Sequence, residues 1–137
     1  MISSDVMRGC NDTIILYLLL KEPSYGYEIS KSIRRMSEDK YVIKETTLYS
    51  AVSRMEKNGY IDSYVSAGDS GKKRTYYRIT TKGIDYYKEK CDEWQVTKDV
   101  IDRFVEENLS DSDKEMNMVS ATGQSESDKL STGREEN

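Results

Sequence analysis

The chain has 137 residues, of which 36% are hydrophobic and 34% are charged, and its formal net charge is −4. This length suits one small domain and excludes a large enzyme built around a deep cleft. The chain has no histidine, which removes the usual general base and the commonest zinc ligand, so we expect no enzyme, no metal site and no cofactor.

The first predicted helix covers residues 5–21 and ends before Pro23, a residue that stops helices. Its inner face is expected to carry Ile14, Leu18 and Leu19. The apolar block at residues 14–20 is too short to cross a bilayer. The first 13 residues lack the basic start and cleavage site of a signal peptide, so we expect a cytoplasmic protein without membrane contact.

A second helix is predicted from residue 24 to residue 40. Its apolar residues recur at helical spacing, at Tyr25, Ile29, Ile33 and Met36. Gly26 would cost about 1 kcal/mol in a helix without some return, so we expect another segment to approach its backbone closely. The basic residues Lys31, Arg34 and Arg35 lie off the apolar stripe, where they form either a solvated face or phosphate contacts.

A short extended link at residues 41–43 leads into a third predicted helix at about 46–58. One face is apolar, with Leu48, Ala51, Val52 and Met55. The opposite face suits hydrogen bonds to phosphates and base edges, because it carries Thr47, Ser50, Ser53, Arg54 and Lys57. Gly59 can take the left-handed conformation that closes a helix.

Two strands are predicted next, at about 60–67 and 74–80, joined by a turn-rich tip at 68–71. In the second strand Tyr77 shares a face with Ile79, and Tyr76 shares the other with Arg78, so one tyrosine is expected in the core. A basic run without an acidic residue lies between Asp69 and Asp85, formed by Lys72, Lys73, Arg74, Arg78 and Lys82.

The net negative charge comes entirely from the C-terminal part. Residues 1–107 carry 18 basic and 18 acidic residues, whereas residues 108–137 carry 3 and 7. A neutral body with a locally positive hairpin is compatible with DNA binding.

A long final helix is predicted at 81–108, capped by Thr80 or Thr81. Its apolar stripe is Ile84, Tyr87, Cys91 and Trp94, then, after an interruption at Lys98, Ile101, Phe104 and Val105. Residues 109–137 have no aromatic residue and are predicted to be a disordered acidic tail. Cys10 and Cys91 form no CxxC pair, so we expect buried or half-buried reduced thiols.

Three segments together resemble the PadR family of transcriptional regulators across about residues 5–107: DTIILYLLLKEPSYGYEISKSI, KETTLYSAVSRMEKNGYIDSYV and KKRTYYRITTKG. The resemblance implies an α+β, mainly α fold: a winged helix-turn-helix DNA-binding domain at 1–80, then a long C-terminal dimerisation helix at 81–108. It further implies a two-fold dimer, in which the final helix packs against the first helix of a partner, on a near-palindromic double-stranded DNA operator. Repression is the outcome that it favours.

The site residues follow from these elements. We expect Thr47, Ser50 and Arg54 to contact bases or phosphates, and Lys72, Lys73, Arg74 and Tyr76 of the wing to contact DNA. Tyr49 either contacts a phosphate or packs on the preceding helix.

The final helix is expected to supply the dimer interface through Ile84, Tyr87, Cys91 and Ile101. Trp94 has two open roles, because it can fill the dimer seam or, as in some proteins of the resembled family, stack on a small aromatic ligand. The alternative function is a winged-helix module that binds proteins without specific DNA binding.

Overall fold

A computed structural model of the chain describes residues 1–106. Its contacts divide the chain between Lys98 and Asp99, and residues 1–98 form one compact unit. Within the described residues, none of the helices combines the length and the hydropathy needed to cross a membrane.

The predicted single helix at 5–21 is wrong, because the structure has two: α1 (Ser4–Met7) and α2 (Asn11–Lys21). Gly9, a poor helix former, lies in the turn between them. The inner face of α2 also differs from the expectation. Ile15, Leu16 and Leu19 are buried, while Ile14 and Leu18 are only half-buried.

The second predicted helix begins two residues later than expected, because Ser24 and Tyr25 form strand β1 (Ser24–Tyr25). They pair antiparallel with Tyr77 and Tyr76 of a later strand, whose edge offers them backbone hydrogen bonds. Helix α3 (Gly26–Met36) then begins at Gly26. The predicted close approach at Gly26 is confirmed, since a Cβ there would overlap the Tyr49 hydroxyl.

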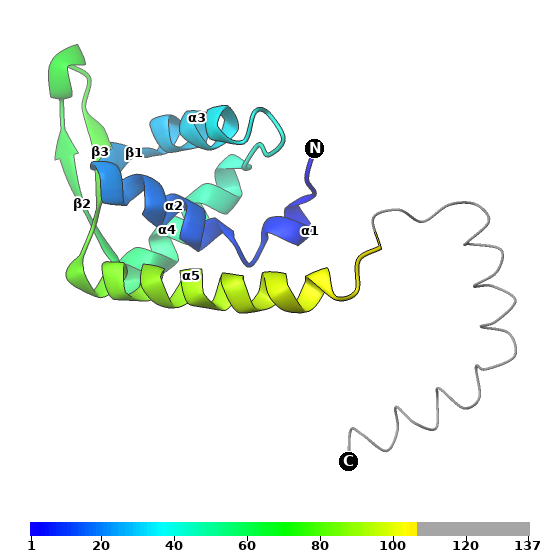
Figure 1. The fold of residues 1–137 in the computed structure, drawn as a ribbon. Coiled ribbons are helices and arrows are strands. Elements are labelled where there is room, and N and C mark those ends of the chain that lie inside the picture. Colours follow the sequence, from blue (N-terminus) through cyan, green and yellow to red (C-terminus); the bar gives the residue numbers. More distant parts are fainter. Residues whose placement is uncertain (107–137) are drawn as a thin grey trace, which may run out of the picture. The chain divides into compact units, whose positions relative to one another are not determined.

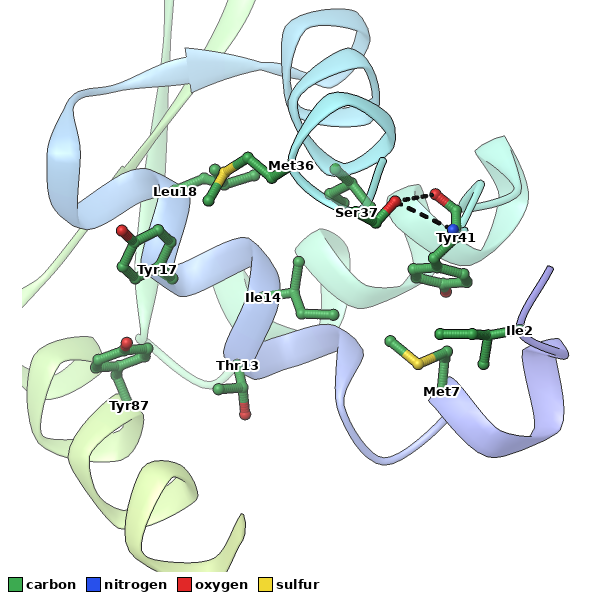
Figure 2. Close-up of a pocket in the computed structure, with 11 residues that line it drawn as sticks. Ile2, Met7, Thr13, Ile14, Tyr17, Leu18, Met36, Ser37, Tyr41 and Tyr87 are labelled. Carbon is green, nitrogen blue, oxygen red and sulfur yellow. Dashed lines mark hydrogen bonds between the residues drawn. The ribbon is translucent and has the colours of Figure 1, made fainter. Parts of the chain in front are cut away.

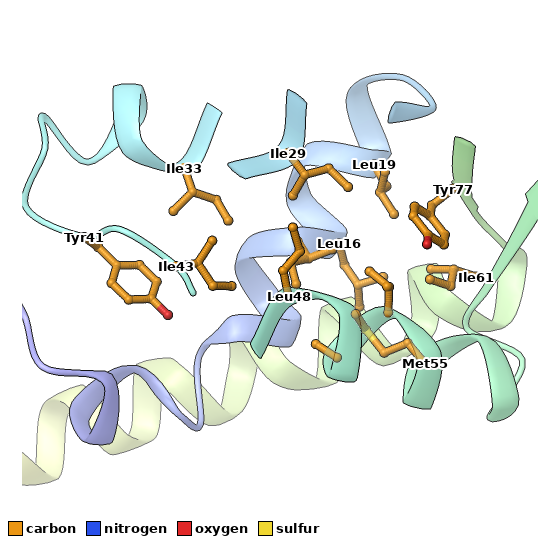
Figure 3. Close-up of a cluster of buried hydrophobic side chains, with 13 residues drawn as sticks. Leu16, Leu19, Ile29, Ile33, Tyr41, Ile43, Leu48, Met55, Ile61 and Tyr77 are labelled. Atoms are coloured by element: carbon orange, nitrogen blue, oxygen red, sulfur yellow. The ribbon is translucent and has the colours of Figure 1, made fainter. Parts of the chain in front are cut away.

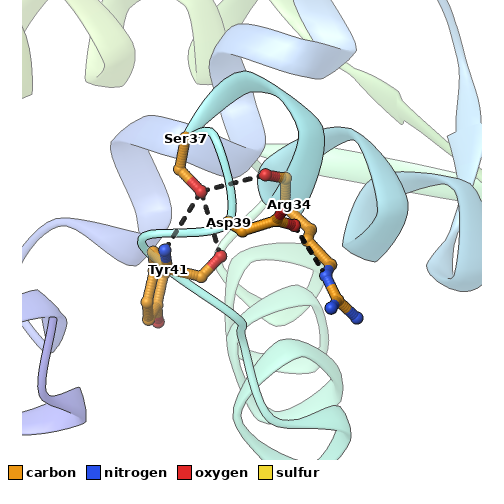
Figure 4. Close-up of polar contacts among 4 residues, drawn as sticks. All are labelled: Arg34, Ser37, Asp39 and Tyr41. Carbon is orange, nitrogen blue, oxygen red and sulfur yellow. Dashed lines mark hydrogen bonds and ion pairs between the residues drawn. The ribbon is translucent and has the colours of Figure 1, made fainter. Parts of the chain in front are cut away.

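Helix α3 ends at Met36, not at residue 40, and Met36 is exposed. Glu38 and Asp39 have φ values of 54° and 64°, a left-handed conformation that ends the helix. The Ser37 hydroxyl accepts a hydrogen bond from the backbone N–H of Tyr41 at 3.1 Å (Figure 4). Arg34 Nε donates to Asp39 Oδ1 at 2.9 Å. These contacts shape the turn that leads into the next helix.

Helix α4 (Glu45–Lys57) confirms the third predicted helix. Its apolar stripe is buried as expected, with Leu48, Ala51, Val52 and Met55 all at 5% exposure or less. Gly59 has a φ of +82°, so the predicted left-handed residue after the helix is confirmed.

Strands β2 (Ile61–Ser66) and β3 (Arg74–Ile79) form the predicted hairpin. The sheet is antiparallel with the order β1-β3-β2, and Ile61 pairs with Ile79. The short 3₁₀ helix η1 (Gly68–Ser70) lies at the hairpin tip, which projects away from the helices (Figure 1).

Helix α5 (Thr81–Asp102) is shorter than the predicted helix at 81–108. The predicted cap is present, since Thr80 Oγ1 accepts from the Gly83 N–H at 3.0 Å. Asp99 and Asp102 lie in the last turn, where negative charge opposes the helix dipole. Residues 107–108 of the predicted helix and the predicted tail at 109–137 lie outside the described residues.

The core lies between α2, α3, α4 and the sheet (Figure 3). Tyr77 is the core tyrosine of β3, as expected, and it is 9% exposed. Tyr41 is also buried, and its hydroxyl donates to Asn11 Oδ1 at 2.6 Å. Helices α2, α3 and α4, with a three-stranded sheet whose β2–β3 hairpin forms the wing, make this a winged helix, which confirms the predicted fold class.

Candidate DNA-binding surface

The outer face of α4 is polar and open. Ser50, Ser53, Arg54 and Lys57 are exposed, and Thr47 is half-buried. Three residues predicted to contact DNA, Thr47, Ser50 and Arg54, come together in one polar hollow of about 290 Å³. The other residues that line this hollow are Arg8, Asn11, Asp12, Thr46 and Ala51.

Arg54 is held by a partner that the sequence analysis missed. Its Nη1 lies 2.9 Å from Asp12 Oδ2 and its Nη2 lies 2.6 Å from Asp12 Oδ1, a bidentate ion pair between α4 and α2. The Asp12 side chain is 11% exposed and the Arg54 side chain 52%. The Tyr86 hydroxyl of α5 donates to Asp12 Oδ2 at 2.8 Å. Three helices therefore meet at one buried carboxylate.

The pKa values of Arg54 and Tyr86 are both raised, and contacts with Asp12 contribute to each shift. The hydrogen bonds to Asp12 raise the pKa of Arg54, so its guanidinium remains charged. Burial, followed by the hydrogen bond to Asp12, raises the pKa of Tyr86 to about 12. Tyr86 is therefore a neutral donor at neutral pH, and Asp12 is an acceptor for both neighbours.

Tyr49 packs against α3, which is one of the two roles left open for it. Its ring lies over the backbone of Gly26, and the residue is 42% exposed. Tyr49 also lines a second hollow, of about 540 Å³, where the start of α3 meets the wing. The hollow is further lined by Tyr25, Gly26, Tyr27, Lys72, Arg74, Thr75 and Tyr77. Two wing cations thus share a hollow with Tyr49 of α4.

The basic side chains of the wing differ in their contacts. Lys72 and Lys73 are exposed, and no acidic side chain lies within 4 Å of either one among residues 1–106. Arg74 is half-buried, and its guanidinium lies 4.4 Å from the centre of the Tyr25 ring. Arg78 pairs with Asp62 at 2.9 Å. The unpaired positive charge of the wing therefore lies at Lys72, Lys73 and Arg74, and the two lysines are its exposed part.

Tyr76 was expected to contact DNA, and the structure places it half-buried between two other tyrosines. Its ring centroid lies 5.4 Å from that of Tyr25 and 5.6 Å from that of Tyr64. Such aromatic contacts stiffen the strands of the wing.

The residues predicted for a dimer interface differ in burial along α5. Ile84, Tyr87 and Cys91 are half-buried, and Tyr87 packs against the core of its own chain. Trp94 is 47% exposed and Ile101 is 55% exposed. Cys10 and Cys91 are both free and half-buried, which confirms the prediction for the thiols.

An apolar hollow of about 360 Å³ lies between α1, α2, α3 and α5 (Figure 2). Tyr87 of α5 faces Tyr17 of α2 at one end, and Ile2 and Met7 lie at the other. No group of three or more His, Cys, Asp or Glu side chains in residues 1–106 is arranged to hold a metal ion.

Comparison with known proteins identifies the family. Residues 15–89 match the transcriptional regulator PadR-like family. An uncharacterised protein of Lysinibacillus sphaericus is 44% identical over 106 residues, which are 77% of this chain and 97% of the relative.

Two solved structures extend the comparison. A transcriptional regulator from Clostridium thermocellum is 62% identical, with a TM-score of 0.72 over 77% of this chain and 100% of that one. A PadR family transcription regulator from Clostridium difficile R20291 is 39% identical, with a TM-score of 0.60 over 69% of this chain and 96% of that one. The family consists of regulators and not of enzymes. The chain therefore belongs to the PadR-like family of transcriptional regulators.

Proposed function

We propose that this protein is a dimeric repressor that binds a near-palindromic operator through α4 and the wing. The observation that carries this proposal is the hollow shared by Tyr49 of α4 and by Lys72 and Arg74 of the wing. A duplex that contacts α4 in its major groove would bring a backbone phosphate to these cations. A regulator of this kind acts where the chromosome lies, in the cytoplasm.

The two parts of this surface contribute differently. Thr47, Ser50 and Arg54 line the polar hollow of α4 and supply the groups that discriminate between base edges. Lys72 and Lys73 supply charge, and each phosphate that they neutralise steepens the salt dependence of binding by about one unit.

The apolar hollow supports the proposed dimer. Tyr17, Tyr87 and Met7 line a mostly apolar surface that stays open among residues 1–106. Trp94 and Ile101 of α5 are also apolar and largely exposed. Packing the distal part of one α5 against the α1 and α2 of a second copy would bury both surfaces. Two α4 helices would then face successive major grooves, about one helical turn apart.

Selection of bound duplexes from a random pool tests the proposal. The full chain should enrich a near-palindrome with two half-sites separated by about one helical turn. An enriched site without two-fold symmetry would overturn the dimer on DNA. A folded protein that enriches no duplex would favour the alternative function, a winged-helix module that binds another protein.

Relief of repression by a small aromatic ligand is part of the same proposal. If Trp94 lies outside the dimer seam, its indole offers an exposed flat face on which such a ligand can stack. Trp94 is the only tryptophan in the chain, so its fluorescence reports directly on binding. Planar aromatic compounds should quench this fluorescence and weaken operator binding together. Quenching that leaves operator affinity unchanged would reject a regulatory role.

A further inference from the structure

The buried carboxylate of Asp12 links the recognition helix to the proposed dimerisation helix. It accepts both hydrogen bonds of the bidentate Arg54 pair and a third from the Tyr86 hydroxyl. No buried polar side-chain atom in residues 1–106 lacks a hydrogen-bond partner. The three side chains come from α2, α4 and α5, so the position of α5 bears directly on a side chain of α4.

The backbone around this network is also tightly joined. Thr80 Oγ1 donates to the Gly59 carbonyl oxygen at 2.7 Å, and Lys82 Nζ donates to the Asn58 carbonyl oxygen at 2.8 Å. The Tyr60 and Tyr86 rings stack with centroids 4.0 Å apart and planes 4° apart. The end of α4 and the first turns of α5 are therefore joined by two hydrogen bonds and one aromatic stack.

The Arg54 guanidinium keeps donors for DNA despite its pairing. A guanidinium has five N–H donors, and two of them are used by Asp12. The side chain is 52% exposed at the polar hollow, next to Ser50 and Thr47. Its direction is fixed by the fork geometry of the pair. Its charge is offset by the carboxylate, which weakens its attraction to any phosphate.

We propose that Asp12, held in place by Tyr86, is a positioning residue that sets operator specificity by orienting Arg54 and offsetting its charge. The recognition helix then discriminates between sequences by the direction of the guanidinium and less by attraction to phosphates. This inference rests on the proposed function. It assigns a role in DNA recognition to two residues, Asp12 and Tyr86, for which the proposed function gives no DNA contact.

Two variants separate orientation from charge. Asp12→Asn removes the counter-charge and replaces one acceptor oxygen by a donor, so Arg54 loses its bidentate partner. It should bind random-sequence duplex more tightly, with a salt dependence steeper by about one unit. Its preference for operator over random duplex should fall about tenfold. Tyr86→Phe keeps the charge but removes one hydrogen bond, so the preference should fall about threefold without a change in salt dependence.

The matched control is Glu89→Gln, which removes one negative charge from an exposed position on α5. It should leave the operator preference and the salt dependence at their wild-type values. The measurement is the affinity of each full-length protein for the selected operator and for a random duplex of the same length, over a series of salt concentrations.

The outcomes are distinguishable. If Asp12→Asn and Tyr86→Phe both behave like Glu89→Gln, the positioning role is refuted while the proposed function stands. If Asp12→Asn fails to fold, Tyr86→Phe alone tests the inference. An operator preference of Tyr86→Phe equal to that of the wild type would then refute it. A wild-type protein that prefers no duplex would instead refute the proposed function.

Discussion

Helix α4 and the wing tip differ in whether their positive side chains have acidic partners. On α4, the guanidinium of Arg54 is paired with a carboxylate that is almost fully buried. At the wing tip, Lys72 and Lys73 have no acidic neighbour within 4 Å among the described residues. The ion pair on α4 thus holds the Arg54 side chain in one direction, whereas the wing exposes the unpaired charges of Lys72 and Lys73. Specificity and general affinity for DNA should therefore respond to different substitutions.

The two regions also differ in how closely their backbones are packed. A Cβ on Gly83, at the junction that anchors α4 to α5, would overlap the Tyr60 carbonyl oxygen and lie 2.8 Å from Ile79 Cγ1. A Cβ on Gly71, at the wing tip, would have no atom within 4 Å. The junction between α4 and α5 has no room for a methyl group at Gly83, whereas Gly71 at the wing tip faces open space.

The largest expected effect is that of Gly83→Ala. The added methyl group must push α5 away from the end of α4, because the atom that it meets belongs to the backbone and cannot rotate aside. The free energy of unfolding should fall by about 2–3 kcal/mol, a typical cost of overpacking. Urea denaturation measures this directly.

The control for Gly83→Ala is Gly9→Ala. A Cβ on Gly9 meets no atom within 4 Å, and its φ is not positive. That variant should unfold at nearly the wild-type urea concentration. Equal stability of both variants would show that the junction between α4 and α5 yields easily, and the contrast with the wing tip would disappear.

The second prediction concerns the charge of the wing. Replacing Lys72 and Lys73 together by glutamine should lower the affinity for any duplex by at least about tenfold and reduce the salt dependence by about two units. The preference for operator over random duplex should not change, because phosphates carry no direct sequence information. Glutamine at Lys88, which is exposed on α5 and lies off its apolar stripe, provides a control for loss of surface charge outside α4 and the wing. A loss of operator preference in the wing variant would mean that the lysines also discriminate between sequences.

The features that were predictable from sequence are those set by local pattern. The apolar stripe of α4 and the hairpin tip at 68–71 depend on residues near one another in the chain, and the structure confirms both. The glycine at 26 was also recognisable, because a costly residue near a helix start implies a close contact.

The features that were missed depend on distant residues. Arg54 and Asp12 are 42 residues apart, and Tyr86 is 74 residues from Asp12. No periodicity connects them, so Arg54 looked like any other polar residue on an outer face. Strand β1 was missed for the same reason, since two residues become a strand only when the edge of β3 lies beside them. The only signal that Asp12 offered was an acidic residue in the first turn of a helix, and that signal is weak.

The smallest expected effect is that of Gly71→Ala at the wing tip. The φ of Gly71 is +75°, a conformation that costs a residue with a Cβ roughly 1–2 kcal/mol. Alanine also restricts the unfolded chain, which offsets part of that cost, so the free energy of unfolding should fall by about 1 kcal/mol or less. Asparagine tolerates the left-handed region better, so Gly71→Asn should fall between the alanine variant and the wild type. Neither variant should alter the salt dependence of DNA binding, because neither changes a charge. A loss of stability as large as that of Gly83→Ala would require a closely packed wing tip. It would contradict the difference in packing between the α4–α5 junction and the wing tip.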